Sequence, residues 1–192
     1  MKSEMIWYVA RASGVVTLGL LTASVLWGLV LSTRAFRAHP RPAWVLDLHR
    51  FLAGSAVIFL AVHVGSVLAD TYVHFGPVNV LVPFTGDWHP TAVAWGIIAM
   101  YLLVTVEVTS LLRSHVPARA WRATHYAAFP LLGLSILHGL TAGTDRHSLW
   151  LRCGIFVAAA AVVGLLAVRA RQASRAPAHV KVRAPRPGRA FS

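Results

Sequence analysis

Acidic residues are scarce in this chain of 192 residues, where six aspartates and glutamates stand against eighteen lysines and arginines. Charged residues make up only 12% of the sequence, whereas 57% are hydrophobic and the mean hydropathy is +0.63. So little charge excludes a soluble domain with an ordinary hydrated surface and predicts a membrane protein. The single cysteine, Cys153, excludes an intramolecular disulfide. The net charge of +12 does not indicate a nucleic-acid partner, because the basic residues flank apolar segments and fill one tail.

Apolar segments long enough to cross a membrane recur along the chain. They cover residues 12–32, 48–69, 91–112, 124–141 and 149–168. We therefore predict an all-α membrane protein, a bundle of about five transmembrane helices in residues 1–168. Residues 169–192 are expected to form a disordered basic tail that is attracted to anionic membrane lipid.

The distribution of basic residues predicts the topology. Lysine and arginine cluster after the first, third and fifth spans and are absent between the second and the third. By the positive-inside rule, the loops after spans one and three and the tail are cytoplasmic. We therefore expect a multi-pass protein of the cell membrane with its N-terminus outside and its C-terminus in the cytoplasm.

Two of the spans carry two histidines each. Thirteen residues separate His49 from His63 in the second span, and twelve separate His125 from His138 in the fourth. At a rise of about 1.5 Å per residue, the members of each set lie about 20 Å apart along their helix. The two spans run parallel in the predicted topology. They therefore predict a first pair, His49 with His125 near the cytoplasm, and a second pair, His63 with His138 near the outside.

Stacked histidine pairs are the ligand set that two bis-histidine haems across a bilayer require. A lone histidine in an apolar helix is more often a hydrogen-bonded core residue, and intramembrane histidines also relay protons. A zinc site is disfavoured because its ligands must surround one ion, whereas the two pairs lie far apart. Two helices with two histidines each, at nearly equal spacing, favour the haem interpretation. A quinol-linked di-haem cytochrome of another family and a histidine-based metal or proton transporter are the alternatives.

The spacing on the fourth span predicts an irregular helix. Fourteen helical steps of about 100° bring His49 and His63 almost onto one face, but thirteen steps leave His125 and His138 about 140° apart. Pro130 removes the backbone hydrogen bond to the carbonyl of Tyr126. We therefore expect a kink or a tightened turn around residues 126–130 that rotates the second half of the helix.

Several phrases around the histidines resemble the ferric reductase-like transmembrane domain. They are LHR and HVGS in the second span, WRATHY and ILHG in the fourth, and AGTD after it. That superfamily includes NADPH oxidases, ferric reductases and the haem-binding membrane subunit of the bacterial methionine sulfoxide reductase system. The likeness covers roughly residues 6–168. It implies two haem b groups, with His49 and His125 on the inner haem iron and His63 and His138 on the outer one.

The resemblance also implies electron transfer from a cytoplasmic donor to an extracytoplasmic acceptor. The tail contains no dinucleotide-binding fingerprint. We therefore expect a haem-carrying membrane subunit of an oxidoreductase, without catalytic residues of its own. Its electrons are expected from a separate cytoplasmic reductase or from a flavin supplied by a partner.

Three arginines are candidates for binding haem propionates, which are anions that need cationic partners in a medium of low dielectric constant. Arg50 and Arg122 lie at the level of the first pair, and Arg11 lies at the outer end of the first span. The alternative for each is a guanidinium that simply reaches the membrane interface. The carboxylate inside the third span, Glu107, is expected to pair with an arginine or to relay protons.

Two further sets of residues are weaker candidates. His74, Asp87, Trp88 and His89 lie in the longest connection, beside the level of the second pair, and would dock an acceptor, hold a metal ion or simply be solvated. Gly54, Gly133 and Gly139 would let a porphyrin approach the backbone or allow close helix contact.

Overall fold

The computed structural model describes residues 2–33, 43–71, 75–143 and 148–174, and this part of the chain folds into helices without strands. Its helices are α1 (Lys2–Ser32), α2 (Ala43–Ala69), α3 (Pro77–Leu81), α4 (Pro90–Leu111), α5 (Ala118–Tyr126), α6 (Ala128–Thr141) and α7 (Leu149–Ser174). Among the described residues four helices, α1, α2, α4 and α7, are long and apolar enough to cross a membrane. The expected membrane-embedded, all-α architecture is confirmed to that extent.

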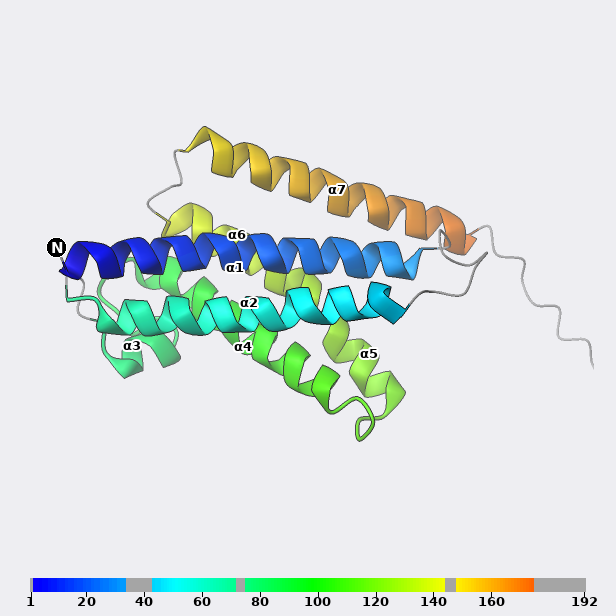
Figure 1. Cartoon of the computed structure of the whole chain (residues 1–192), viewed down its shortest axis with the longest axis horizontal. Helices are drawn as coiled ribbons and strands as arrows, with labels where there is room; N and C mark the ends of the chain where they lie inside the picture. Colours follow the sequence, from blue (N-terminus) through cyan, green and yellow to red (C-terminus); the bar gives the residue numbers. More distant parts are fainter. Residues whose placement is uncertain (1, 34–42, 72–74, 144–147, 175–192) are drawn as a thin grey trace, which may run out of the picture.

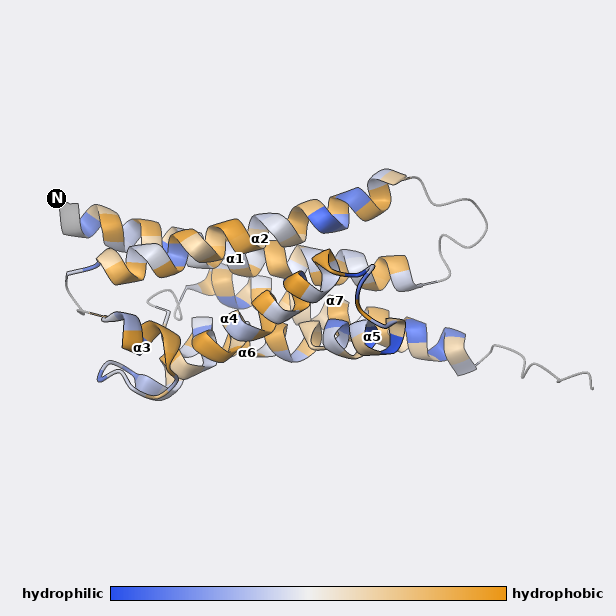
Figure 2. Ribbon diagram, turned by 90° about the horizontal axis from the view of Figure 1, so that it is seen from below, coloured by the Kyte–Doolittle hydropathy of each residue, from blue (hydrophilic) through white to orange (hydrophobic). Residues whose placement is uncertain are grey.

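The helices form a bundle elongated along the axes of its long members (Figure 1). Helices α1 and α2 lie side by side as an antiparallel hairpin, and α4 packs mainly against α6. Helix α6 also contacts α1, so the two halves of the bundle meet there. Helix α7 packs against α1 and leaves most of its own surface uncovered. Residues with apolar side chains cover most of the bundle, whereas hydrophilic ones gather on α5 and on the last turns of α7 (Figure 2).

The buried core lies between the two histidine pairs and extends to the level of the first pair. Its members on α1, α4 and α6 are Leu21, Val25, Leu29, Ala99, Leu103, Leu131 and Leu132. Ala56, which is fully buried, stands on α2 halfway between His49 and His63. Apolar residues from three helices thus fill the interior between the pairs, and several of them lie beside His49 and His125.

The expected fourth span is two helices rather than one. Helix α5 ends at Tyr126 and α6 begins at Ala128. Between them, Ala127 has φ −63° and ψ −11°, and its N–H donates to the carbonyl of Thr124, three residues back, at 3.0 Å. This is the tightened turn expected beside Pro130, and that prediction is confirmed.

Helix bounds differ from the predicted spans mainly at the ends. Helices α1 and α2 begin ten and five residues before the apolar runs that mark them, because the residues that flank those runs also form helix. Helix α7 continues to Ser174, six residues into the segment expected to be a disordered tail from residue 169. The rest of that tail, residues 175–192, lies outside the described residues.

Candidate functional site

The four histidines of α2, α5 and α6 come together in two pairs. The ring centroids of His49 and His125 lie 6.1 Å apart with an angle of 68° between the ring planes. Those of His63 and His138 lie 6.3 Å apart with an angle of 79°. These are the first and second pairs expected from the sequence, brought onto one side of α5 and α6 by the turn at Ala127.

In three of the four histidines, Nδ1 meets a backbone carbonyl oxygen of a neighbouring helix. The contacts are His63 with Ala10 at 2.7 Å, His138 with Ala92 at 2.8 Å and His49 with Ser24 at 3.1 Å. The Ser24 hydroxyl oxygen is also 3.2 Å from Nδ1 of His49. A carbonyl oxygen can only accept, so Nδ1 carries the proton and Nε2 keeps the lone pair of each neutral ring. This is the tautomer of a histidine that binds a metal through Nε2.

Each of these three carbonyls is followed four residues later by a glycine, and we call the combination a glycine seat. A Cβ atom at Gly96 would lie 2.7 Å from Nδ1 of His138, one at Gly14 would lie 3.0 Å from Nδ1 of His63, and one at Gly28 would lie 3.2 Å from Cε1 of His49. Because glycine has no side chain, the imidazole can approach the carbonyl of the residue four positions earlier. That carbonyl oxygen has two lone pairs, so it can accept both from the imidazole and from the helical N–H. Gly14 and Gly28 are fourteen residues apart, which is the spacing of His49 and His63 on the antiparallel helix.

His125 is the exception. Its Nδ1 is buried and has no hydrogen-bond partner within the described part of the chain. The ring stacks on Trp121, with centroids 4.9 Å apart and planes at 25°, and the guanidinium of Arg113 lies 4.7 Å from the centre of the Trp121 ring. This histidine is therefore held by aromatic stacking instead of a glycine seat.

The distances between paired rings fit a metal between them. With metal–nitrogen bonds of about 2.0 Å and a ring centre roughly 1.1 Å behind each nitrogen, two axial imidazoles on one metal have centres roughly 6.2 Å apart. Edge-to-face aromatic contacts fall in the same range, so the ring distances agree with ligand geometry and with simple packing alike. The Nδ1 hydrogen bonds add a fixed tautomer, which a metal ligand requires. The described residues contain no group of three or more histidine, cysteine or acidic residues that could hold a metal ion. Two protein donors suit a haem, whose macrocycle supplies the other four nitrogens.

A cavity of about 110 Å³ lies at the first pair. His49 and His125 line it together with Glu107, Tyr126 and Phe129. The expected arginine partner of Glu107 is not found among the described residues, and its side chain faces this cavity instead. At the edge of the cavity, Nη2 of Arg169 donates to the hydroxyl of Tyr126 at 3.1 Å. Arg169 was assigned to the tail by its sequence, and it is a cation that the sequence reasoning missed.

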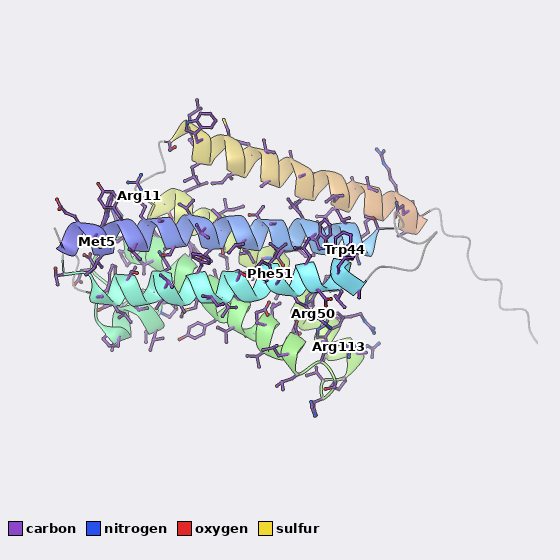
Figure 3. All side chains as sticks on the ribbon, in the orientation of Figure 1. Met5, Arg11, Trp44, Arg50, Phe51 and Arg113 are labelled. Atoms are coloured by element: carbon purple, nitrogen blue, oxygen red, sulfur yellow. The ribbon has the colours of Figure 1, made fainter. Side chains whose placement is uncertain are left out.

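The three candidate arginines lie at the expected ends but not against the histidines. Figure 3 shows Arg50 and Arg113 toward one end of the bundle and Met5 and Arg11 toward the other. Arg50 is 71% exposed and lies 3.7 Å from Asp47 of the same helix, and Arg122 is also exposed. The guanidinium of Arg11 lies 5.1 Å from the ring centre of Trp7. Their role toward a bound propionate stays a prediction.

Of the remaining candidates, those within the described residues do not contact either pair. His74 lies outside the described residues, and Trp88 packs edge-on against Phe75 and His89. A Cβ atom at Gly54 or Gly133 would meet nothing within 4 Å, and one at Gly139 would make only an ordinary contact. Their role toward a porphyrin stays a prediction, and the glycines that contact the histidines are Gly14, Gly28 and Gly96. The fourteen-residue repeat of the first two was the signal in the sequence that could have revealed them.

The interpretation of the site depends on this geometry and on the resemblance stated from the sequence. Comparison with protein-family models, curated proteins and solved structures finds no match to the chain. The resemblance to the ferric reductase-like transmembrane domain therefore remains a prediction.

Proposed function

We propose that this chain is the membrane cytochrome b subunit of a ferric reductase-like system, with two haem groups that carry electrons across the membrane. The observation that carries the proposal is the geometry of the histidine pairs. Twice in the bundle, two imidazoles lie 6.1 or 6.3 Å apart, and three of the four rings donate from Nδ1 to a carbonyl. A histidine kept only for packing or for relaying protons does not need a fixed Nε2 lone pair opposite a second imidazole.

The residues of the bundle have two proposed roles: the histidine pairs would bind haem, and the apolar residues would exclude water. Each pair would hold one haem iron, and the seats of α1 and α4 fix the tautomer and orientation of His49, His63 and His138. A haem iron held by two histidines would supply one-electron exchange. The apolar residues between the pairs keep water and other ligands out of the middle of the bundle.

The proposed direction of electron transfer is from the first pair to the second. It rests on the arginines at the end of the bundle that holds the first pair. By the positive-inside rule, this end faces the cytoplasm. The described ones are Arg50, Arg113, Arg119, Arg122, Arg169 and Arg171. A separate reductase or a reduced flavin would donate there, and an extracytoplasmic acceptor would take electrons at the other end.

The direct test of cofactor content is the purified full-length protein. We expect two haem b per chain by extraction and sharp absorption bands on reduction. His89 is a matched control, because it is a described histidine outside both pairs, and His89→Ala should leave the haem content at two. A preparation folded but free of haem, with zinc or proton transport in its place, would overturn the proposal.

The direction is tested in proteoliposomes. A reductase and flavin are supplied on the side of the C-terminus, and an impermeant acceptor is enclosed on the other side. We expect reduction of the acceptor in the wild type and its loss in each of the four histidine-to-alanine variants. Equal activity with the donor confined to the opposite face would refute the direction while leaving the haem assignment intact.

A further inference from the structure

The connection between α2 and α4 carries an exposed apolar surface. Residues 75–85, which include α3, contain no charged residue. Val80 of α3 is buried, and the side chains around it that point away from the bundle are apolar as well. Four of them are 45–61% exposed, and we call them the loop patch: Val78, Leu81, Val82 and Phe84. A short helix at a boundary with water normally turns polar residues outward, so the loop patch is unsuited to water.

Helix α4 places the loop patch within the depth of the membrane. The hydroxyl of Tyr101 donates to the carbonyl of Leu81 at 2.7 Å. Tyr101 stands eleven residues after Pro90, the first residue of α4, a distance of about 16 Å along the helix. The whole of α4 is 22 residues, or about 33 Å, which is close to the thickness of a hydrocarbon core. Even with the tyrosine side chain tilted toward the start of its helix, the Leu81 carbonyl therefore lies beside the span and not beyond its end.

The loop patch also continues the exposed apolar surface of α4. In Figures 1 and 2, α3 lies within the length of the bundle, beside the end of α2. Between residues 92 and 100, no residue of α4 is exposed, and α3 contacts α4. Exposed side chains begin at Tyr101 and recur at Val104 and Val108. The surface of this spanning helix thus passes into the loop patch through the bond between Tyr101 and Leu81.

The polar groups of the segment find their partners within the protein. Asn79 accepts from the N–H of Gly76 through Oδ1 at 3.0 Å, and its Nδ2 donates to the carbonyl of Thr85 at 3.0 Å. The Thr85 hydroxyl donates to the carbonyl of Val82 at 2.9 Å and lies 3.3 Å from that of Val78. Lipid offers no hydrogen bonds, so a backbone that enters it must be satisfied by the protein. Side chains of the segment meet that requirement at the end of α3, where a helix leaves carbonyls unpaired.

The turn after α3 keeps a large ring at the surface. Phe84 has φ 67°, which lies in the left-handed region that bulky residues rarely adopt, and a turn with positive φ favours glycine or asparagine. Its side chain is more than half exposed, so contacts within the described part of the chain cover less than half of it. Burial of the ring among lipid chains would offset the backbone strain.

We propose that residues 75–85 form a re-entrant segment whose loop patch inserts among the acyl chains of the membrane leaflet at this end of the bundle. The occupant is lipid, because the loop patch is continuous with the exposed surface of a spanning helix, has no charge and has its polar groups satisfied internally. Tyr101 and Asn79 hold the segment in place beside α4. The inference does not depend on the proposed haem function.

The experiment measures the water exposure of single cysteines in the full-length protein, reconstituted in phosphatidylcholine nanodiscs with Cys153→Ser as background. Leu81→Cys and Phe84→Cys are treated with a water-soluble maleimide. We expect both to react as slowly as Ile58→Cys, on the exposed apolar surface of the spanning helix α2. Asp87→Cys is the matched control from the same connection, three residues after Phe84, and should react several-fold faster.

A phosphatidylcholine with a diazirine on its acyl chain then distinguishes a lipid cover from a protein cover. In the wild type, we expect illumination to attach this lipid to the peptide that contains residues 75–85. Tyr101→Phe removes the bond to Leu81, so it should raise the maleimide reactivity of Phe84→Cys and reduce the lipid adduct. Thr105→Val is the control, because it removes another hydroxyl from the exposed side of α4 and should change neither reading.

Each contrary outcome overturns a defined part of the proposal. Rapid reaction of both loop-patch cysteines would show that the segment lies in water and would overturn the insertion. Slow reaction without a lipid adduct would show that protein, such as a second copy of the chain, covers the loop patch, and would overturn the assignment to lipid. Unchanged reactivity in Tyr101→Phe would overturn the role of that hydroxyl in holding the segment.

Discussion

The two histidine pairs are built from the same helices but are held differently. In the second pair, both rings donate to a backbone carbonyl, of Ala10 or Ala92, and both lie against a glycine. In the first pair, only His49 is held in this way, while His125 stacks on Trp121. The first pair also borders the cavity that Glu107 faces.

This difference shows that a histidine is oriented by the neighbouring helix as much as by its own. A histidine side chain has two rotatable bonds, and neither its identity nor its spacing fixes which ring nitrogen faces the partner histidine. A carbonyl with a glycine four residues later fixes that choice, and it does so wherever the antiparallel register brings it opposite a histidine. The second pair is therefore the more rigid of the two, and the first is the more adjustable.

The largest expected effect comes from removing a ligand of the second pair. His138→Ala should reduce the haem content from two per chain to one, because a single histidine does not retain a six-coordinate haem. The first pair does not depend on His138 and should keep its haem. Haem extraction and the reduced spectrum measure both points, and retention of two haems per chain would contradict the assignment of the pairs.

A smaller, graded effect is expected from adding a methyl group to each seat. Gly96→Ala should impair haem binding most, Gly14→Ala less and Gly28→Ala least, because the added Cβ atom would lie 2.7, 3.0 and 3.2 Å from the nearest atom of the histidine ring. Gly19→Ala is the matched control on α1, since a Cβ atom there meets nothing within 4 Å. In an open helical position, alanine stabilises a helix by roughly 0.5–1 kcal/mol. Haem content after purification gives the order, and an impaired Gly19→Ala would refute the explanation.

The relative orientation of the rings predicts a spectroscopic signature. Ring planes at 68° and 79° are closer to perpendicular than to parallel, so both oxidised haems should give strongly anisotropic low-spin electron paramagnetic resonance signals. The first-pair signal should be the broader, because the Nδ1 atom of His125 is not anchored. Signals typical of parallel imidazole planes at both sites would show that the rings reorient on binding.

The smallest effect is expected at Ser24. Its hydroxyl and its carbonyl both lie near Nδ1 of His49, at 3.2 and 3.1 Å. Ser24→Ala removes the hydroxyl and leaves the carbonyl, so the tautomer and the haem content should stay unchanged. Thermal loss of haem, followed by absorbance, should change only slightly, since a single hydrogen bond contributes about 1 kcal/mol. Complete loss of the first-pair haem would show that the hydroxyl, not the carbonyl, orients His49.

The apolar runs were sufficient to predict the long helices, and the parallel course of the second and fourth spans was sufficient to predict which histidines pair. Apolar runs predicted the long helices, and the mismatch between thirteen residues and the helical repeat predicted the turn at Ala127. The seats could not be predicted in the same way, because they depend on which residue of one helix lies opposite which residue of another. That register is set by packing over the whole interface. The contact of Arg169 with Tyr126 was missed for a related reason, since helix propensity in the last turns of α7 continues beyond its apolar run.

The hairpin of α1 and α2 has a consequence for how the protein is made. It is synthesised before α4 to α7, and it already contains one histidine of each pair together with the seat that holds it. A polar group in lipid must find its partner within the protein, and Nδ1 of His49 and Nδ1 of His63 do so before the later helices emerge. If the proposed haem function holds, the hairpin would be a stable half of each site, and binding of haem would favour the packing of α5 and α6 against it.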